Sequence, residues 1–263
     1  MKTFSLWAGD SATMLRRQLL HMLRYPSMTV ILVGMPVVFL LLFVYVLGGT
    51  LGAGLGGPSG GRAAYADYVA PGVIVLTVAA VAQGTAISVA MDMTGGIIAR
   101  FRTMAISRAS VLTGHVLGAM IQTAIAVAVV TGVALLVGWR PTAGPLEWVA
   151  AIGVLAMVSW AITWLTVALG LVSESVETAS NIPMPLILLP FLGSAFVPTD
   201  SMPTALRWFA EYQPFTPVIE TIRGLLMGAP IGNSAVLAVA WCAAISLAGF
   251  LWARALFNRD PAK

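Results

Sequence analysis

The sequence predicts an all-α membrane protein with six transmembrane helices. Of its 263 residues, 59% are hydrophobic and only 9% are charged, whereas a soluble domain carries about 25% charged residues. Six stretches approach or exceed the roughly 17 to 25 apolar residues that cross a bilayer as a helix, namely 28–48, 68–91, 111–138, 147–172, 181–198 and 234–256. Helices of this length satisfy their own backbone hydrogen bonds, as lipid requires.

The positions of the basic residues predict the orientation of these helices. Ten of the fourteen Lys and Arg fall in segments on the same side of the membrane as the N-terminus. Short cytoplasmic loops retain Lys and Arg, so we expect both termini in the cytoplasm. The first apolar run is too long for the core of a cleavable signal peptide and is expected to remain as the first span.

Residues 10–25, DSATMLRRQLLHMLRY, predict a helix that lies on the membrane surface. Apolar residues recur at the spacing of one helical face, and basic residues occupy another, as an interfacial helix requires. Pro26 is expected to end this helix and turn the chain into the first span. The predicted organisation is therefore a cytoplasmic interfacial helix over 1–26 and a six-helix transmembrane domain over 27–263.

Catalytic and metal-binding interpretations lack the residues that they need. The glycine-rich stretch 48–66 resembles a phosphate-binding loop only in composition, because the chain has no lysine between Lys2 and Lys263 and such a loop requires one. His21 and His115 have no cluster of Cys or carboxylate residues around them in the sequence, whereas a metal site usually takes three or four ligands. We expect no catalytic residue, no metal and no cofactor on this chain, and any ATP hydrolysis on a separate subunit.

The stretch DMTGGIIARFRTMAISRASVLTGHVL, residues 92–117, joins the second and third spans on the cytoplasmic side. Asp92 and the Gly95–Gly96 pair end the span, and a short basic segment with interspersed apolar residues follows. An amphipathic segment of this kind docks in a groove of a soluble partner or lies at the membrane surface. Other cytoplasmic loops have a similar composition, so the residue pattern alone leaves both interpretations open.

The motif D-x-x-x-G-x-x-x-R-F-R-T-M-x-I-S-R-x-x-V-L-x-G-H, residues 92–115, resembles the cytoplasmic loop of ABC-2-type transporter permeases, particularly those of daunorubicin/doxorubicin-resistance exporters. Ala105 departs from the family, whose members usually have proline there. The resemblance implies a coupling loop at about 92–110 that contacts the ATPase subunit through Arg100, Phe101, Arg102, Thr103, Met104, Ile106, Ser107 and Arg108. It also implies a smaller second contact at the short inner turn that carries Glu174 and Glu177.

Residues 188–226 resemble the region that follows the fifth span in the same permeases, through the motifs F-V-P, S-M-P, L-R and P-x-T-P. Pro203 suits the first turn of a short helix that Pro214 ends, and Thr216 and Pro217 suit the N-cap and first position of a second helix. Each helix has about half of the ~20 residues that span a bilayer. We therefore expect an extracellular re-entrant hairpin at about 199–228. Its candidate gate residues are Pro203, Arg207, Trp208, Pro214, Thr216, Pro217, Glu220 and Arg223.

Glu220 and Arg223 stand three residues apart on the second short helix, a spacing that allows an ion pair. The sequence leaves open whether this pair is structural or takes part in gating.

The resemblance implies a transmembrane permease subunit of an ATP-driven ABC exporter in the bacterial inner membrane, moving a hydrophobic or amphiphilic substrate such as a drug or lipid. The implied partners are an ABC ATPase subunit that binds ATP and Mg, a second permease subunit, identical or paralogous, and membrane lipids, but no nucleic acid. The alternatives are a permease for polysaccharide or lipid-linked glycan export, a purely structural subunit and an ion-gradient-driven carrier. A carrier places ionisable residues near the middle of the membrane, whereas Asp67, Asp92, Glu147 and Glu174 fall at the ends of predicted spans.

Overall fold

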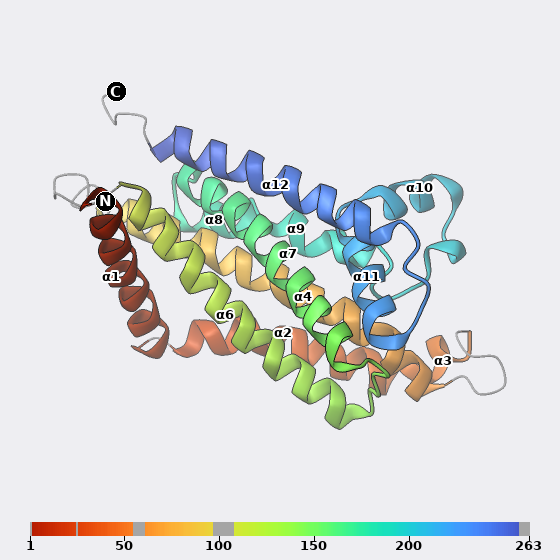
Figure 1. The fold of residues 1–263 in the computed structure, drawn as a ribbon. Coiled ribbons are helices and arrows are strands. Elements are labelled where there is room, and N and C mark those ends of the chain that lie inside the picture. The colour runs from red at the N-terminus through yellow and green to blue at the C-terminus, as the bar shows by residue number, and fades with distance from the viewer. Residues whose placement is uncertain (1, 25, 55–60, 97–107, 258–263) are drawn as a thin grey trace.

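The computed structural model describes residues 2–24, 26–54, 61–96 and 108–257, and this part of the chain is helical, without strands (Figure 1). Five helices are long and apolar enough to cross a membrane, over Pro26–Gly52, Arg62–Thr94, Ser110–Val137, Pro145–Val172 and Ser234–Phe257. The prediction of a helical membrane protein is thereby confirmed. The first of these helices consists of α2 (Pro26–Leu41), a π-helical stretch η1 (Leu42–Leu47) and α3 (Gly48–Gly52).

Helix α4 (Arg62–Thr94) is the central helix of the bundle. In its most apolar 18-residue stretch, 83% of the residues are buried, because α2, α6, α7, α8 and α11 all pack against it. A helix that is apolar on every side is typical of such a position. The largest hydrophobic core of the described residues is built along α4, from Tyr65 to Ala82, and includes Trp139, Phe215 and Ile219 from other segments.

Helices α6 (Arg108–Val137), α7 (Pro145–Val172) and α12 (Ser234–Phe257) complete the set of long helices. Pro145 occupies the start of α7, where its missing N–H costs no hydrogen bond. Helix α12 packs closely on α7, and a Cβ atom added to Gly249 would lie 2.7 Å from the backbone nitrogen of Leu165. Glycine at this position therefore permits the close approach of the two helices.

The fifth expected span, residues 181–198, consists of short helical pieces instead of one long helix. They are α8 (Val176–Asn181), α9 (Met184–Leu188) and the 3-10 turn η3 (Leu189–Leu192). Pro183, Pro185 and Pro190 break the helix because proline has no N–H to donate and its ring clashes with the preceding turn. The helical run Val176–Leu192 is thus shorter than the five long helices, and a sixth membrane crossing stays a prediction.

Two short helices follow in the region of the expected outer hairpin. A 3-10 turn η4 (Thr199–Ser201) leads to α10 (Thr204–Tyr212) and then α11 (Phe215–Met227). Helix α11 ends at Gly228, whose φ of 72° lies in the left-handed region that favours glycine. The expected end near Met227 agrees with the structure, but the expected start at Thr216 is wrong. Helix α11 begins two residues earlier, with Pro214 at the N-cap position and Phe215 as its first residue. The Thr216 hydroxyl accepts hydrogen bonds from Gln213 Nε2 and the backbone N–H of Ser194 instead.

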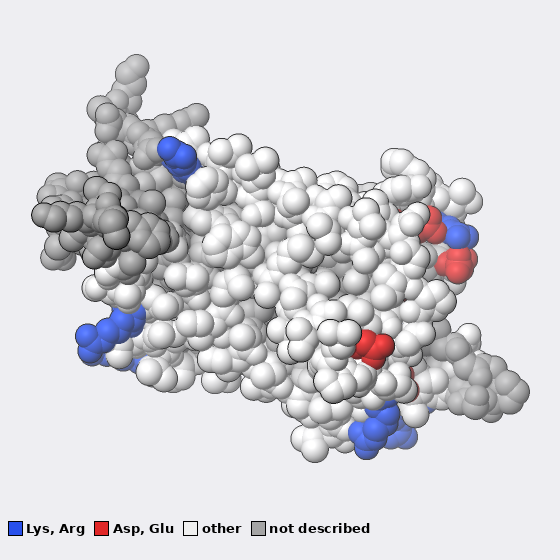
Figure 2. Space-filling view, viewed as in Figure 1, with Lys and Arg blue, Asp and Glu red and all other residues white. Residues whose placement is uncertain are grey.

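Different helices lie at the two ends of the bundle (Figure 1). Helix α1 (Lys2–Arg24) lies across one end, and α10 and α11 lie at the other. A second apolar core joins Val89, Val111, Trp164 and Phe257, so the end of α4, the start of α6 and the end of α12 meet near α1. Figure 2 shows the charged residues of one face near these two ends, with a wide uncharged band between them. This band is what a bilayer-spanning surface requires.

Candidate functional site

Four polar side chains meet where α1 crosses the ends of α4 and α6, and we call Arg17, Gln18, Asp92 and His115 the inner cluster. The Arg17 guanidinium donates two hydrogen bonds to the Asp92 carboxylate, with Nη1–Oδ2 at 2.7 Å and Nη2–Oδ1 at 2.6 Å. His115 Nε2 lies 3.1 Å from Asp92 Oδ2, and Gln18 Nε2 lies 2.5 Å from His115 Nδ1. The hydrogen bonding to Asp92 raises the pKa of Arg17 above its ordinary value. Because the guanidinium donates to both carboxylate oxygens, this ion pair also fixes the relative orientation of the Arg17 and Asp92 side chains.

Close packing of α1 on α6 brings the inner cluster together. A Cβ atom added to Gly114 would lie 2.5 Å from Met14 Cβ, and one added to Gly118 would lie 2.9 Å from Gln18 Cβ. Both glycines therefore let α1 approach within a distance that any other residue would obstruct. Met14 is buried in this contact, so α1 is packed on the bundle and not merely adsorbed beside it.

The inner cluster flanks the segment for which a coupling role is expected. Asp92 lies in the last turns of α4, and His115 lies two turns into α6, whose first residue is Arg108. The other expected coupling residues, Arg100, Phe101, Arg102, Thr103, Met104, Ile106 and Ser107, lie outside the described residues. Helix α1 is thus linked to both helices that flank the segment 97–107, to α4 by an ion pair and to α6 by a hydrogen bond.

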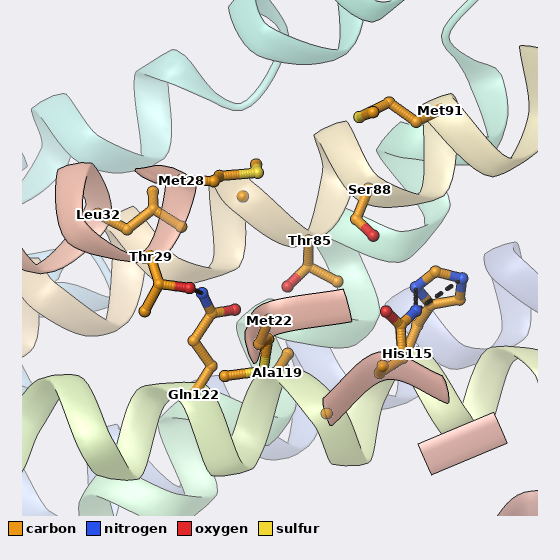
Figure 3. Close-up of a pocket in the computed structure, with 13 residues that line it drawn as sticks. Met22, Met28, Thr29, Leu32, Thr85, Ser88, Met91, His115, Ala119 and Gln122 are labelled. Carbon is orange, nitrogen blue, oxygen red and sulfur yellow. Dashed lines mark hydrogen bonds between the residues drawn. The ribbon is translucent and has the colours of Figure 1, made fainter. Parts of the chain in front are cut away.

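A small cavity of about 50 Å³ adjoins the inner cluster between α1, α2, α4 and α6 (Figure 3). Its wall includes Thr85 and Ser88 of α4 and His115 of α6, and Gln122 donates a hydrogen bond of 3.1 Å to the Thr29 hydroxyl. Polar side chains therefore extend from the inner cluster into the cavity between α1 and the other three helices.

Glu174 lies in the turn between α7 and α8, Glu177 lies in the first turn of α8, and both residues are exposed. The Ser175 hydroxyl accepts a hydrogen bond from the backbone N–H of Thr178 and caps α8. The two glutamate side chains are therefore not packed into the core. Nothing in the described residues brings them to the inner cluster.

At the opposite end, Arg223 of α11 lies at the centre of a second polar group. We call Arg223, Tyr68, Ser194 and Glu220 the outer cluster. Arg223 Nη2 donates to the backbone carbonyls of Ser194, at 2.7 Å, and Tyr68, at 3.1 Å, and Nη1 lies 2.6 Å from Glu220 Oε1. Its guanidinium carbon lies 3.9 Å from the centroid of the Tyr68 ring, within the range of a cation–π interaction. The expected Glu220–Arg223 ion pair is present, and it is mostly buried on the arginine side.

The outer cluster holds the irregular segment 193–198 against α4. The Tyr68 hydroxyl donates to the Ser194 carbonyl at 2.9 Å, and the Tyr65 hydroxyl donates to the Phe196 carbonyl at 3.1 Å. These carbonyls belong to no helix, so without such donors they would be buried unpaired. A non-helical backbone is tolerated at membrane depth only where protein satisfies it in this way.

The remaining outer candidates divide between exposed and buried positions. Arg207 is exposed and pairs with Asp200 and Glu211, each at 2.6 Å. The exposed Trp208 ring lies 5.6 Å from the Tyr212 ring, on the outward side of α10. Pro203 and Pro214 precede α10 and α11, respectively, while Thr216 and Pro217 are buried in the first turn of α11. The structure thus joins Glu220 and Arg223 and leaves Arg207 and Trp208 apart from them.

The described residues include no group of three or more His, Cys, Asp or Glu side chains that would hold a metal ion. Within each polar cluster, hydrogen bonds join side chains and backbone groups of different helices. The chain is thus a polytopic helical membrane protein with one polar cluster at each end of its bundle.

Sequence comparison places this membrane protein in a family. The model of the ABC-2 type transporter family matches residues 11–227, and the chain therefore belongs to the ABC-2 type transporter family. The match runs from α1 to the end of α11, so it includes both polar clusters and the segment 97–107.

Curated relatives agree with this assignment. The chain is 29% identical over 218 residues to the daunorubicin resistance ABC transporter permease protein DrrB1 of Streptomyces coeruleorubidus, covering 82% of this chain and 74% of that protein. It is 24% identical over 160 residues to the probable doxorubicin resistance ABC transporter permease protein DrrC of Mycobacterium tuberculosis, covering 61% of this chain and 58% of DrrC. The family predicted from the two motifs is thereby confirmed.

Proposed function

We propose that this chain is the transmembrane permease subunit of an ATP-driven exporter that moves a hydrophobic or amphiphilic compound, drug-like or lipid-like, out across the bacterial inner membrane. The observation that carries the proposal is the similarity, over 82% of the chain, to a permease named for daunorubicin resistance. The largely uncharged middle of the bundle supports it, because an uncharged path suits such a cargo better than a small ion. Residues 199–228 would form a re-entrant hairpin on the outer side.

The energy source in this proposal is a separate ABC ATPase subunit that binds ATP and Mg. Two permease subunits, identical or paralogous, would stand above two ATPase subunits, with both termini of each permease in the cytoplasm. The segment Arg100 to Arg108 would contact the ATPase, with Glu174 and Glu177 as a smaller second contact. The inner cluster supports this arrangement because it ties α1 to α4 and α6, the two helices that flank that segment.

ATP binding would close the ATPase pair and displace the coupling segment. Since Arg17, Asp92 and His115 link α1, α4 and α6, these helices would move together and not one at a time. The path would then open toward the hairpin near Arg223. The exposed carboxylates of Glu174 and Glu177 are available to a soluble partner.

The test is to purify the chain gently from its native membrane and to identify co-purifying proteins by mass spectrometry. We expect an ABC ATPase in stoichiometric amount. The paired variant Arg100→Glu with Arg102→Glu should insert normally and lose most of the ATPase, whereas Arg140→Glu, on the predicted outer side, should retain it. Recovery of the intact chain without any ATPase, together with transport that depends on an ion gradient, would replace the exporter with the carrier alternative.

A further inference from the structure

An apolar cavity of about 340 Å³ lies between α6 and α7, and we call it the lateral slot. Ile74 of α4 and Leu226 of α11 form its floor, and both are 1% exposed. At its edge, Ile152 of α7 is 60% exposed. The slot therefore opens sideways on the surface of two membrane-spanning helices, where a molecule dissolved in the bilayer would reach it. Its volume falls within the roughly 300–1,000 Å³ of small-molecule sites.

Small residues on the two helices account for the opening. Ala124 and Ala128 of α6 face Ala151 and Ala156 of α7 across the slot, so neither helix fills the space between them. Its lining runs over residues 120–131 of α6 and 148–159 of α7, and each stretch is about 16 Å long at the roughly 1.5 Å rise per residue of an α-helix. An elongated apolar space that stays empty loses dispersion contacts on every wall, so an occupant of matching shape is favoured.

A polar atom without a partner lines the inner end of the slot. Ser159 of α7 is 2% exposed, and its Oγ atom has no hydrogen-bond partner among the described residues. Leaving a buried hydroxyl unpaired is unfavourable. An acyl chain would leave it so, whereas a molecule that carries a hydroxyl, carbonyl or amine would pair with it.

The outer end of the slot offers an aromatic surface. Trp148 lines it from the first turn of α7, and its ring is held edge-on to Trp139 at a centroid distance of 6.2 Å. A flat ring system gains both buried area and specific ring geometry beside such a side chain. Apolar walls, one hydroxyl and one fixed aromatic ring together describe a site for a single amphiphile.

We propose that the lateral slot binds one molecule of the exported compound as it arrives from the bilayer, with its apolar body between α6 and α7 and a hydrogen-bonding group at Ser159. This inference rests on the proposed exporter function and names where that function first takes up its cargo. The ligand class is a compact amphiphile with an apolar ring system and at least one hydrogen-bonding group.

Doxorubicin is a suitable probe, because one relative is named for resistance to it and its fluorescence anisotropy reports binding. The full chain would be purified and placed in phosphatidylcholine nanodiscs for the titration. We expect saturable binding that Ala156→Phe weakens by about tenfold or more, since the new ring occupies the slot, and that Ser159→Ala weakens by about fivefold through one lost hydrogen bond. Ala150→Phe and Ser246→Ala, at positions that do not line the slot, should bind as the wild type does.

Three results would overturn the proposal. The first is equal binding by the wild type, Ala156→Phe and Ser159→Ala. The second is a phospholipid that native mass spectrometry finds on the wild type and not on Ala156→Phe, with doxorubicin binding unchanged, which would make the slot a lipid seat. The third is an altered oligomeric state of Ala156→Phe, which would assign the slot to a protein neighbour. None of these results removes a co-purifying ATPase, so the site fails separately from the proposed exporter function.

Discussion

Replacement of Arg223 by methionine should lower the thermal stability of the chain more than any exposed arginine replacement. The methionine keeps much of the apolar stem but removes the charged hydrogen bonds to the Ser194 and Tyr68 carbonyls, and the Ser194 carbonyl retains only the Tyr68 hydroxyl as a side-chain donor. A hydrogen bond to a charged group contributes about 1.5–3 kcal/mol, and breaking a buried ion pair costs about 3–5 kcal/mol. The Glu220 side chain is 33% exposed, so water solvates part of its carboxylate once the arginine is gone. We therefore expect the variant to lose about 4 kcal/mol of stability in total.

The assay is a thermal-shift measurement on the purified chain in detergent, followed by intrinsic tryptophan fluorescence. For a chain of this size each kcal/mol changes Tm by about 2–4 °C, so Arg223→Met should lower Tm by about 10 °C. The Tm of Arg223→Lys should fall between those of the wild type and Arg223→Met, because a lysine ammonium keeps the charge but cannot donate to both carbonyls with the geometry of a guanidinium.

Arg207→Met is the matched control, because Arg207 also forms ion pairs but is exposed. Its Tm should equal that of the wild type, since exposed ion pairs contribute little. A decrease of less than 2 °C for Arg223→Met, or equal decreases for the two variants, would show that the outer cluster does not hold segment 193–198 in place.

Two further predictions concern the inner end and the packing of α4. Asp92→Asn should loosen α1, so that trypsin cleaves after Arg24, the last residue of α1, faster than in the wild type. The exchanged pair Asp92→Arg with Arg17→Asp keeps Arg24 and should restore part of the protection, whereas unchanged cleavage of Asp92→Asn would mean that the ion pair does not secure α1. Gly72→Ala should destabilise the chain by about 1–3 kcal/mol through overpacking, because its new Cβ would lie 2.6 Å from the Ala195 carbonyl oxygen. Gly132→Ala, which meets no atom within 4 Å, should be neutral or slightly stabilising in the same thermal assay, and an equal loss in both variants would contradict the close approach at Gly72.

The long helices could be predicted because each follows from a local property of the sequence. A continuous apolar run must form a helix in lipid whatever surrounds it. Helices α4, α7 and α12 each contain the stretch expected to span, and α6 contains all of its stretch except the last residue. Their ends extend past the apolar runs, as α4 does from Arg62 to Thr94, because a helix does not need to stop where the apolar residues stop. The stretch 181–198 was misleading, since its composition is apolar enough but three prolines interrupt the backbone hydrogen bonds.

The same distinction separates the two polar clusters. Glu220 and Arg223 are three residues apart on one helix, so their pairing could be expected from spacing alone. Arg17 and Asp92 are 75 residues apart, and their contact depends on how α1 crosses α6 at two glycines. The available signal was a lone carboxylate at the end of a span, which requires a partner when it is buried. From the sequence, Arg17 is one of the basic residues on the polar face of an interfacial helix, and Asp92 only marks the end of a span.

The burial of α4 has a consequence for how the chain meets its neighbours. Because other helices of the same chain pack around α4, 83% of the residues in its most apolar stretch are buried, and little of that stretch remains for lipid or for a second subunit. The helices at the periphery are α2, α6 and α12, whose most apolar stretches are only 17%, 22% and 17% buried. The core is therefore complete within one chain, and assembly would add contacts to a finished fold. In the proposed exporter, such a subunit would therefore accept an identical or a paralogous neighbour without refolding.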